Sequence, residues 1–139
     1  MGVDSKHKIV HSAVATPANV SDATVLPELL HGEETRVWGD GGYQGQTAAI
    51  HRAAPRAQDF TQRRCRYKDG LDEAVRAKNR TKSRVRSKVE HVFGTLKLRF
   101  GFTKVRYRGL KKNANRLFAT FALVNLFTVR KKLLAGATA

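Results

Sequence analysis

Apolar and polar residues recur with helical spacing over residues 83–97, and this stretch organises the rest of the chain. One side of the expected helix is apolar and carries Val85, Val89, Val92 and Leu96. At 100° per residue, the other side carries Glu90, with these residues within about 40° of it: Ser83, Arg86, Gly94 and Lys97. The pattern predicts an amphipathic helix that docks its apolar side on a core and presents one carboxylate among bases.

Two interpretations of this polar face are open. Arg and Lys one or two turns from a Glu are common as solvated ion pairs on a helix surface. The alternative is a functional face, in which Gly94 leaves room for a partner to approach Glu90. The helix alone does not decide between them.

The remaining patterns predict an α/β order of elements. The expected elements are a strand over 9–16, a short helix over 22–30, a strand over 35–39, a helix over 46–54, a strand over 58–61, a long helix over 71–100 and a last helix beginning at Asn113. The last helix repeats apolar residues at helical spacing, and its expected core face is Leu117, Phe118, Phe121, Val124, Phe127 and Leu134.

Asp40 follows the expected strand over 35–39 directly, and glycines come after it. A carboxylate at the C-terminal end of a strand lies where α/β folds place their chemistry. Asp before Gly is also ordinary turn or N-cap chemistry. Asp40 is therefore either a functional carboxylate or a turn or N-cap residue.

The net charge indicates the class of binding partner. The 139 residues include 27 Lys and Arg against 11 Asp and Glu, a net charge of +16 that indicates a polyanion, most simply nucleic acid. A purely electrostatic binder would have the same balance. A basic loop and a basic connector supply the expected DNA contacts: Arg63, Arg64, Arg66, Lys104, Arg106 and Arg108.

Cysteine content and hydropathy bear on location. Cys65 is the only cysteine, which excludes an intrachain disulfide and fits a reducing cytoplasm. The apolar run over residues 117–129 is too short to span a bilayer and contains Asn125. We therefore expect a soluble cytoplasmic protein with no membrane association.

A strand that ends in Asp40 and a helix that bears Glu90 are suited to two-metal phosphodiester chemistry. Two ions about 3.5–4 Å apart, held by a few carboxylates, activate the attacking oxygen and stabilise the leaving oxygen. Hard oxygen ligands favour Mg²⁺ or Mn²⁺.

Three parts of the sequence contain distinctive motifs: VATPANVSD at 14–22, HGEE and GDGGYQG within 31–45, and KVEHVFGTLKLRFGFTKVRYRGLKKNANRLF at 88–118. These motifs resemble insertion-sequence transposases of the DDE class, close to the insertion-sequence-five group. The family signature Tyr-x2-Arg-x3-Glu-x6-Lys is matched in spacing by Arg86, Glu90 and Lys97, while Ser83 replaces the tyrosine. The resemblance implies an RNase H-like catalytic domain that acts on transposon ends and target DNA.

Carried over by position, the resemblance makes Asp40 and Glu90 catalytic metal ligands. It implies that Arg86 and Lys97 contact transposon-end phosphates. The family's first catalytic aspartate lies on a first strand that would precede Met1, and Asp4 matches a second-strand position with no metal role. We therefore expect residues 1–139 to form one partial RNase H-like domain with a long Glu-bearing helix and an apolar C-terminal helix.

Two functions remain open for such a chain. One is the C-terminal catalytic portion of a transposase, inactive alone and active only if the missing part is supplied by frameshifting or by another chain, either an N-terminal transposase portion or a copy in a homo-oligomer. The other is a non-catalytic basic DNA binder, either a decayed remnant or a truncated regulator of transposition. The sequence does not separate these functions.

Overall fold

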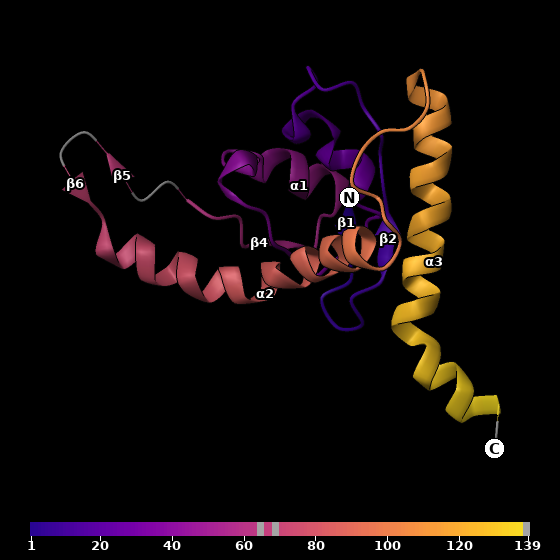
Figure 1. Cartoon of the computed structure of the whole chain (residues 1–139). Coiled ribbons are helices and arrows are strands. Elements are labelled where there is room, and N and C mark those ends of the chain that lie inside the picture. The colour runs from indigo at the N-terminus through magenta and orange to yellow at the C-terminus, as the bar shows by residue number, and fades with distance from the viewer. Residues whose placement is uncertain (64–65, 68–69, 138–139) are drawn as a thin grey trace. The chain divides into compact units, whose positions relative to one another are not determined.

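The computed structural model describes residues 1–63, 66–67 and 70–137, which form helices and short strands (Figure 1). In chain order the elements are β1 (Gly2–Val3), β2 (Val10–Ser12), the 3-10 helix η1 (Asp22–Leu29), β3 (Arg36–Val37), the 3-10 helix η2 (Gly41–Tyr43), α1 (Thr47–Ala53), β4 (Gln58–Asp59), β5 (Arg66–Tyr67), β6 (Gly70–Leu71), α2 (Glu73–Leu98) and α3 (Leu110–Ala137).

The chain divides into two compact units with separate cores. The terminal unit combines Met1–Pro17 with Lys88–Ala139, and the central unit is Ala18–Ser87. Helix α2 belongs to both, because the division falls within it.

The core of the terminal unit forms where α2, α3 and β2 meet. Its buried members are Val10, Val92, Leu96, Phe121 and Val124. The α2 pair is spaced i, i+4 and the α3 pair i, i+3, so each helix places both of its residues on one face. Burial of these side chains is the main force that stabilises the unit.

An amide side chain joins α3 to the hairpin of this unit. β1 and β2 pair antiparallel, with Val3 opposite Val10. The side chain of Asn125 accepts a hydrogen bond from Val10 N at 2.9 Å and donates one to Val10 O at 2.8 Å. Asn125 thus takes the place of a neighbouring strand at the free edge of β2, which lies beside α3 in Figure 1.

The central unit contains a parallel strand pair and a small core. β3 pairs with β4 in parallel, with Arg36 opposite Gln58 and Val37 opposite Asp59. The intervening α1 returns the chain to the start of β4, as a parallel connection requires. The buried core residues come from η1, α1 and the turn after α1: Leu26, Ile50, Ala54 and Ala57.

Most predicted elements occur, with shorter boundaries. The mixed α/β order, the long Glu-bearing helix and the long C-terminal helix are confirmed. The strand expected over 9–16 is only Val10–Ser12, and η1 is a 3-10 helix with Pro27 inside it. Proline has no backbone N–H and clashes with the preceding turn of an α-helix, which favours the tighter, irregular form.

Two predictions for α3 were wrong. The helix begins at Leu110 rather than Asn113, because the Asn113 side chain bonds back to the preceding turn, donating to Tyr107 O at 2.5 Å and Gly109 O at 2.8 Å. Leu134 is 68% exposed and Phe118 is 44% exposed, so neither is core. Helical spacing identifies a face but does not tell how far along the helix that face is covered.

Candidate active site

Asp40 lies at the C-terminal end of β3, as predicted. The strand pairing continues one step beyond the regular strands, where Gln62 N donates to Gly39 O at 2.9 Å. The next residue, Asp40, is the N-cap of η2, and its Oδ1 accepts from Gly42 N at 2.9 Å. The N-cap interpretation of Asp40 is therefore correct, and it occupies only one of the two carboxylate oxygens.

The glycines around Asp40 allow its close packing. A Cβ added at Gly42 would lie 3.0 Å from Asp40 Oδ1, and one added at Gly39 would lie 3.1 Å from Tyr43 Cβ. Both distances are too short for a side chain without a shift of its neighbours. The sequence around Asp40 thus holds the carboxylate in a tight turn.

Arg86 brings α2 to this carboxylate. Its Nη1 lies 3.8 Å from Asp40 Oδ2, and the two side chains are 35% and 48% exposed. The pair is thus half-exposed and screened by solvent. The contact places the polar face of α2 at the end of β3, within the central unit.

Three more α2 side chains fasten the segment that follows β4. Gln62 Nε2 donates to Ser83 Oγ at 2.6 Å, and Lys82 Nζ donates to Thr61 O at 2.7 Å. Asn79 Nδ2 donates to Arg63 O at 2.6 Å. Ser83, at the position where the signature has tyrosine, is therefore an anchor between α2 and the strand pair.

Sequence reasoning missed the role of Asp59, the last residue of β4. Its carboxylate accepts from Thr47 Oγ1 at 2.6 Å, from Thr61 N at 2.7 Å and from the Thr61 hydroxyl. Burial acts to raise the pKa of Asp59, but these hydrogen bonds and the charge of Lys82 outweigh it and hold the pKa below its ordinary value. A carboxylate inside an expected strand was the available signal, since a half-buried Asp needs donors.

Glu90 and Lys97 belong to the part of α2 in the terminal unit. Both are exposed, whereas Val92 and Leu96 on the same helix are buried. The predicted division of this helix into an apolar face and a polar face is confirmed at these positions. Because α2 is continuous, Glu90 follows Arg86 by one turn on the same face.

The amino-acid sequence matches the family model described as "Transposase DDE domain" over residues 1–126. The chain belongs to the DDE transposase family. Its role is therefore in DNA transposition, and DNA is its general kind of partner. No solved structure matches the chain.

DDE transposase domains generally use divalent metal ions. Carboxylate oxygens are suitable ligands for Mg²⁺ or Mn²⁺, so the chemistry of Asp40 and Glu90 fits this class of ion. Among the residues that the structure describes, however, no three His, Cys, Asp or Glu side chains are grouped so that they could hold a metal ion.

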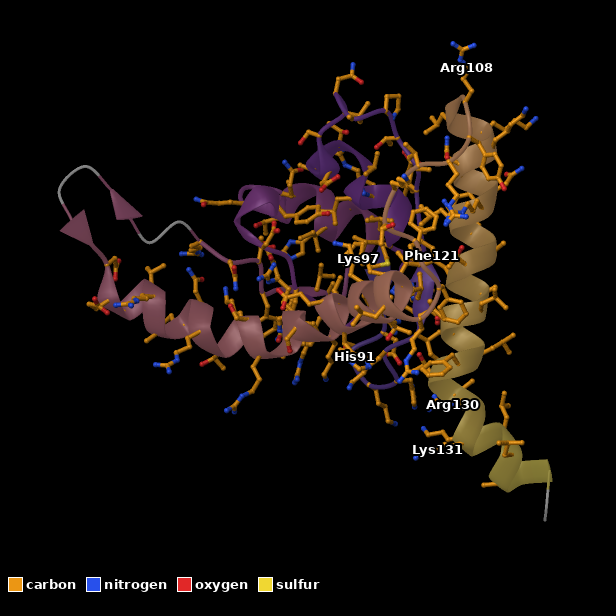
Figure 2. All side chains as sticks on the ribbon, viewed as in Figure 1. His91, Lys97, Arg108, Phe121, Arg130 and Lys131 are labelled. Carbon is orange, nitrogen blue, oxygen red and sulfur yellow. The ribbon has the colours of Figure 1, made fainter. Side chains whose placement is uncertain are left out.

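The predicted DNA contacts of this transposase domain fall in two segments of the chain, residues 63–66 and 104–108. Arg63 is exposed, Arg64 lies outside the described residues, and Arg66 is described only as backbone in β5. Lys104, Arg106 and Arg108 are exposed in the connector between α2 and α3, and Figure 2 shows Arg108 extending away from the start of α3.

The connector is held in a defined shape by α3. Asn113 Oδ1 accepts from Arg106 N at 3.3 Å and from Tyr107 N at 3.2 Å, and Arg116 donates to Lys104 O at 3.1 Å. The guanidinium of Arg116 also lies 4.5 Å from the centre of the Phe102 ring. These bases thus project from a fixed backbone.

No helix in the described part of the chain has the length and apolar character needed to cross a membrane.

Proposed function

We propose that the chain is the C-terminal catalytic portion of an insertion-sequence-five-type transposase, with Asp40 and Glu90 as two of its three metal-binding carboxylates. In this proposal the third carboxylate is the family's first aspartate, supplied by an N-terminal transposase portion or by another chain. The complete site then cleaves and transfers DNA strands. In this proposal the fold is RNase H-like without its first strand, an interpretation supported by an antiparallel pair followed by a parallel pair.

The contact between Arg86 and Asp40 carries the proposal. It places one residue of the signature, Arg86, beside the strand end that bears Asp40. Glu90 is the next signature residue along α2, and neighbours at i, i+4 have Cβ atoms about 5–6 Å apart. Two unrelated surface carboxylates would give no reason for Arg86 to lie beside Asp40.

The residues have distinct proposed roles. Asp40 keeps one oxygen on Gly42 N, which fixes the direction of the other. Bound metal ions would supply the activation of the attacking oxygen and the stabilisation of the leaving oxygen. Arg86 and Lys97 bind phosphates of the transposon end, and the bases of the loop and connector (Arg63, Arg64, Arg66, Lys104, Arg106 and Arg108) extend this contact.

Iron-mediated cleavage of the polypeptide tests the two ligands directly. Fe²⁺ bound in place of Mg²⁺ generates hydroxyl radicals with ascorbate and peroxide, and these cut the backbone near the metal. We expect fragments that end near both Asp40 and Glu90, lost in Asp40→Asn and in Glu90→Gln. Asp22→Asn, at an exposed carboxylate of η1, is the matched control and should leave the fragments unchanged.

Fragments at only one of the two positions, or fragments that survive both substitutions, would contradict the shared metal site. The 139-residue chain should also show no DNA strand cleavage with Mg²⁺ or Mn²⁺. Two carboxylates do not hold two ions in the geometry of an in-line displacement. Robust nicking that is lost in Asp40→Ala would overturn this part of the proposal.

The second candidate is a non-catalytic DNA binder that regulates transposition or is a decayed remnant. The net charge of +16 and the absence of a three-ligand group among the described residues favour it. This candidate predicts DNA binding without any specific iron-mediated cleavage. The same experiment therefore separates the two functions.

A further inference from the structure

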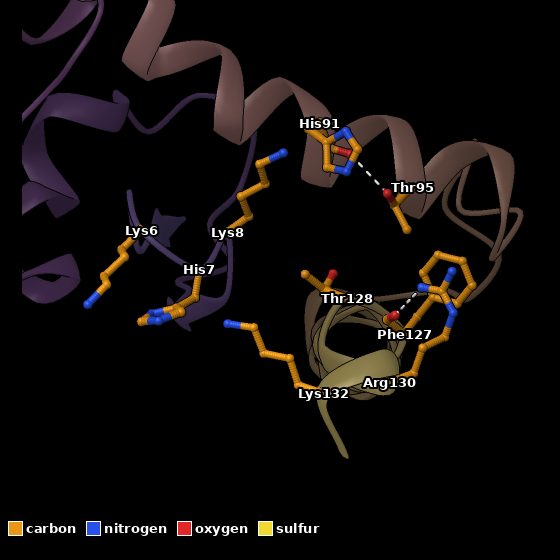
Figure 3. Close-up of a pocket in the computed structure, with 9 residues that line it drawn as sticks. All are labelled: Lys6, His7, Lys8, His91, Thr95, Phe127, Thr128, Arg130 and Lys132. Carbon is orange, nitrogen blue, oxygen red and sulfur yellow. Dashed lines mark hydrogen bonds between the residues drawn. The ribbon is translucent and has the colours of Figure 1, made fainter. Parts of the chain in front are cut away.

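A basic pocket lies within the terminal unit, away from the residues assigned above. It is formed by Lys6, His7 and Lys8 of the β1–β2 turn, His91 of α2, and Arg130 and Lys132 of α3, and its cavity volume is about 340 Å³. Figure 3 shows these residues on three separate elements, with the end of the Lys6 side chain directed away from α2 and α3. We call it the turn pocket.

The charge of the turn pocket is one-sided. Four Lys and Arg side chains and two His side chains line it, and its lining within the described residues includes no carboxylate. The nearby acid Asp4 is used by the turn itself, accepting from Lys6 N at 3.0 Å, His7 N at 2.8 Å and His7 Nδ1 at 2.7 Å. The pocket therefore suits an anion.

The turn that bears Lys6 and Lys8 is fixed in place. Lys8 adopts a left-handed backbone conformation with φ of 60°, and its N–H donates to Asp4 O at 2.9 Å. Lys88 of α2 donates to Ser5 O from the other side. These contacts hold the turn against α2, so the ammonium groups extend from an ordered backbone.

On α2 and α3, the hydroxyl groups of the pocket already donate within their helices, so the charged side chains are the donors for an anion. Thr95 Oγ1 donates to His91 O at 3.0 Å and Thr128 Oγ1 donates to Val124 O at 2.8 Å, so both hydroxyl protons are used within their helices. Arg130 donates to Phe127 O, and its guanidinium lies 3.7 Å from the centre of the Phe127 ring. This anchoring orders the guanidinium, whose five N–H donors exceed that one bond.

We propose that the turn pocket binds the sugar-phosphate backbone of DNA, as a phosphate site separate from Asp40 and Glu90. DNA is the general partner of the family, and the volume exceeds that of a lone phosphate and falls in the range of small-ligand sites, about 300–1,000 Å³. On α2, His91 and Thr95 are rotated about 100° and 140° from Glu90. The turn pocket thus uses a different face of α2 from the catalytic proposal.

Charge-matched variants test this inference. The triple variant Lys6→Gln, Lys8→Gln, Lys132→Gln removes three positive charges from the pocket. The control Lys111→Gln, Lys112→Gln, Lys131→Gln removes three exposed charges of α3 outside it. The readout is the affinity for a fluorescein-labelled 20-base-pair duplex of arbitrary sequence, measured at several salt concentrations.

We expect the pocket variant to bind roughly ten- to a hundredfold more weakly at low salt, with a log–log salt slope smaller by about two to three. The control should lose less than about threefold, because its charges make no fixed phosphate contact. Equal losses in the two variants would reduce the pocket to general surface charge and overturn the proposal. Unchanged binding by the pocket variant would overturn it too.

Lysine acetylation footprinting of the wild-type chain gives a test that does not depend on folding of a variant. Duplex DNA should slow acetylation of Lys6, Lys8 and Lys132 at least several-fold more than that of Lys111 and Lys112. Tripolyphosphate at matched phosphate concentration should protect them less. Protection by tripolyphosphate alone would assign the pocket to a free polyphosphate instead. Asp40→Asn should leave this footprint unchanged, so failure here is distinct from failure of the catalytic proposal.

Discussion

Helix α2 is held by different kinds of contact in the two units. In the central unit, Asn79, Lys82, Ser83 and Arg86 make polar contacts with the ends of the strand pair. In the terminal unit, Val92 and Leu96 are 1% and 3% exposed in an apolar core. One helix thus has a polar attachment and an apolar attachment.

The two attachments do different work. An intramolecular hydrogen bond contributes only about 0.5–1.5 kcal/mol net, but it has direction, so a set of them fixes rotation of the helix about its axis. A buried Leu or Val contributes about 1.5–3 kcal/mol without direction. The apolar part of α2 therefore stabilises the terminal unit, and the polar part orients residues 79–86 against the strand pair of the central unit.

The largest expected effect is at the apolar attachment. Leu96→Ala should lower the free energy of unfolding by about 2–5 kcal/mol, because it removes buried methyl groups and leaves a cavity. Leu98→Ala, two residues away and 87% exposed in the wild type, is the control and should change it by less than about 0.5 kcal/mol. Urea unfolding monitored by circular dichroism measures both. Similar values for the two variants would show that α2 is not held through its apolar face.

The next effect is at the amide that joins α3 to β2. Asn125→Ala leaves the N–H and C=O of Val10 without their partner, which should lower the free energy of unfolding by about 1–3 kcal/mol. Asn115→Ala, on an exposed face of α3, is the control and should be nearly neutral. Hydrogen exchange of the Val10 amide should also speed up only in Asn125→Ala. Slow hydrogen exchange of the Val10 amide in that variant would contradict this role of the Asn125 side chain.

Much of the fold was predictable because its signals are local. Helical spacing gave the two faces of α2, and the strand that ends before Asp40 followed from a short apolar run bounded by glycine. The ends of elements were less accurate, since they depend on side-chain bonds such as those of Asn113. Leu134 was wrongly expected in the core for a similar reason, because the tertiary structure decides which part of a helix face is covered.

The candidate site was predictable in residue type and only partly in arrangement. Spacing alone paired Arg86 with Glu90, but nothing local in the sequence connected Arg86 to Asp40, which lies 46 positions earlier. The convergence of Asp40 and Glu90 stays a prediction. The anchoring by Gln62 and the role of Asp59 were missed, because one residue's hydrogen-bond partners in another element are not encoded by periodicity.

The free energy of unfolding should depend on pH through Asp59, whose carboxylate accepts hydrogen bonds from Thr47 and Thr61. The pKa of Asp59 is lowered in the folded state, so its ionised form adds stability at neutral pH, and this is lost as pH falls through the folded pKa. Asp59→Asn should therefore flatten the fall in unfolding free energy between about pH 5 and pH 2. Thr47→Val should flatten it partly, and should add nothing in the Asp59→Asn background. An unchanged slope in Asp59→Asn would contradict the assignment.

The smallest effect on stability is expected for Arg86→Gln, which should instead change the salt dependence of DNA binding. Arg86→Gln breaks a half-exposed pair at 3.8 Å, and such pairs contribute about 0–1 kcal/mol, so unfolding should hardly change. If Arg86 also binds a transposon-end phosphate, the log–log salt slope of DNA affinity should fall by about 0.9. Arg84→Gln is the matched control, since it removes the same charge from an exposed position of α2 that is rotated about 160° from Arg86 and about 120° from Glu90. Equal salt slopes for the two variants would mean that Arg86 has only a structural role. A smaller slope in Arg86→Gln alone would show that Arg86 contacts a DNA phosphate.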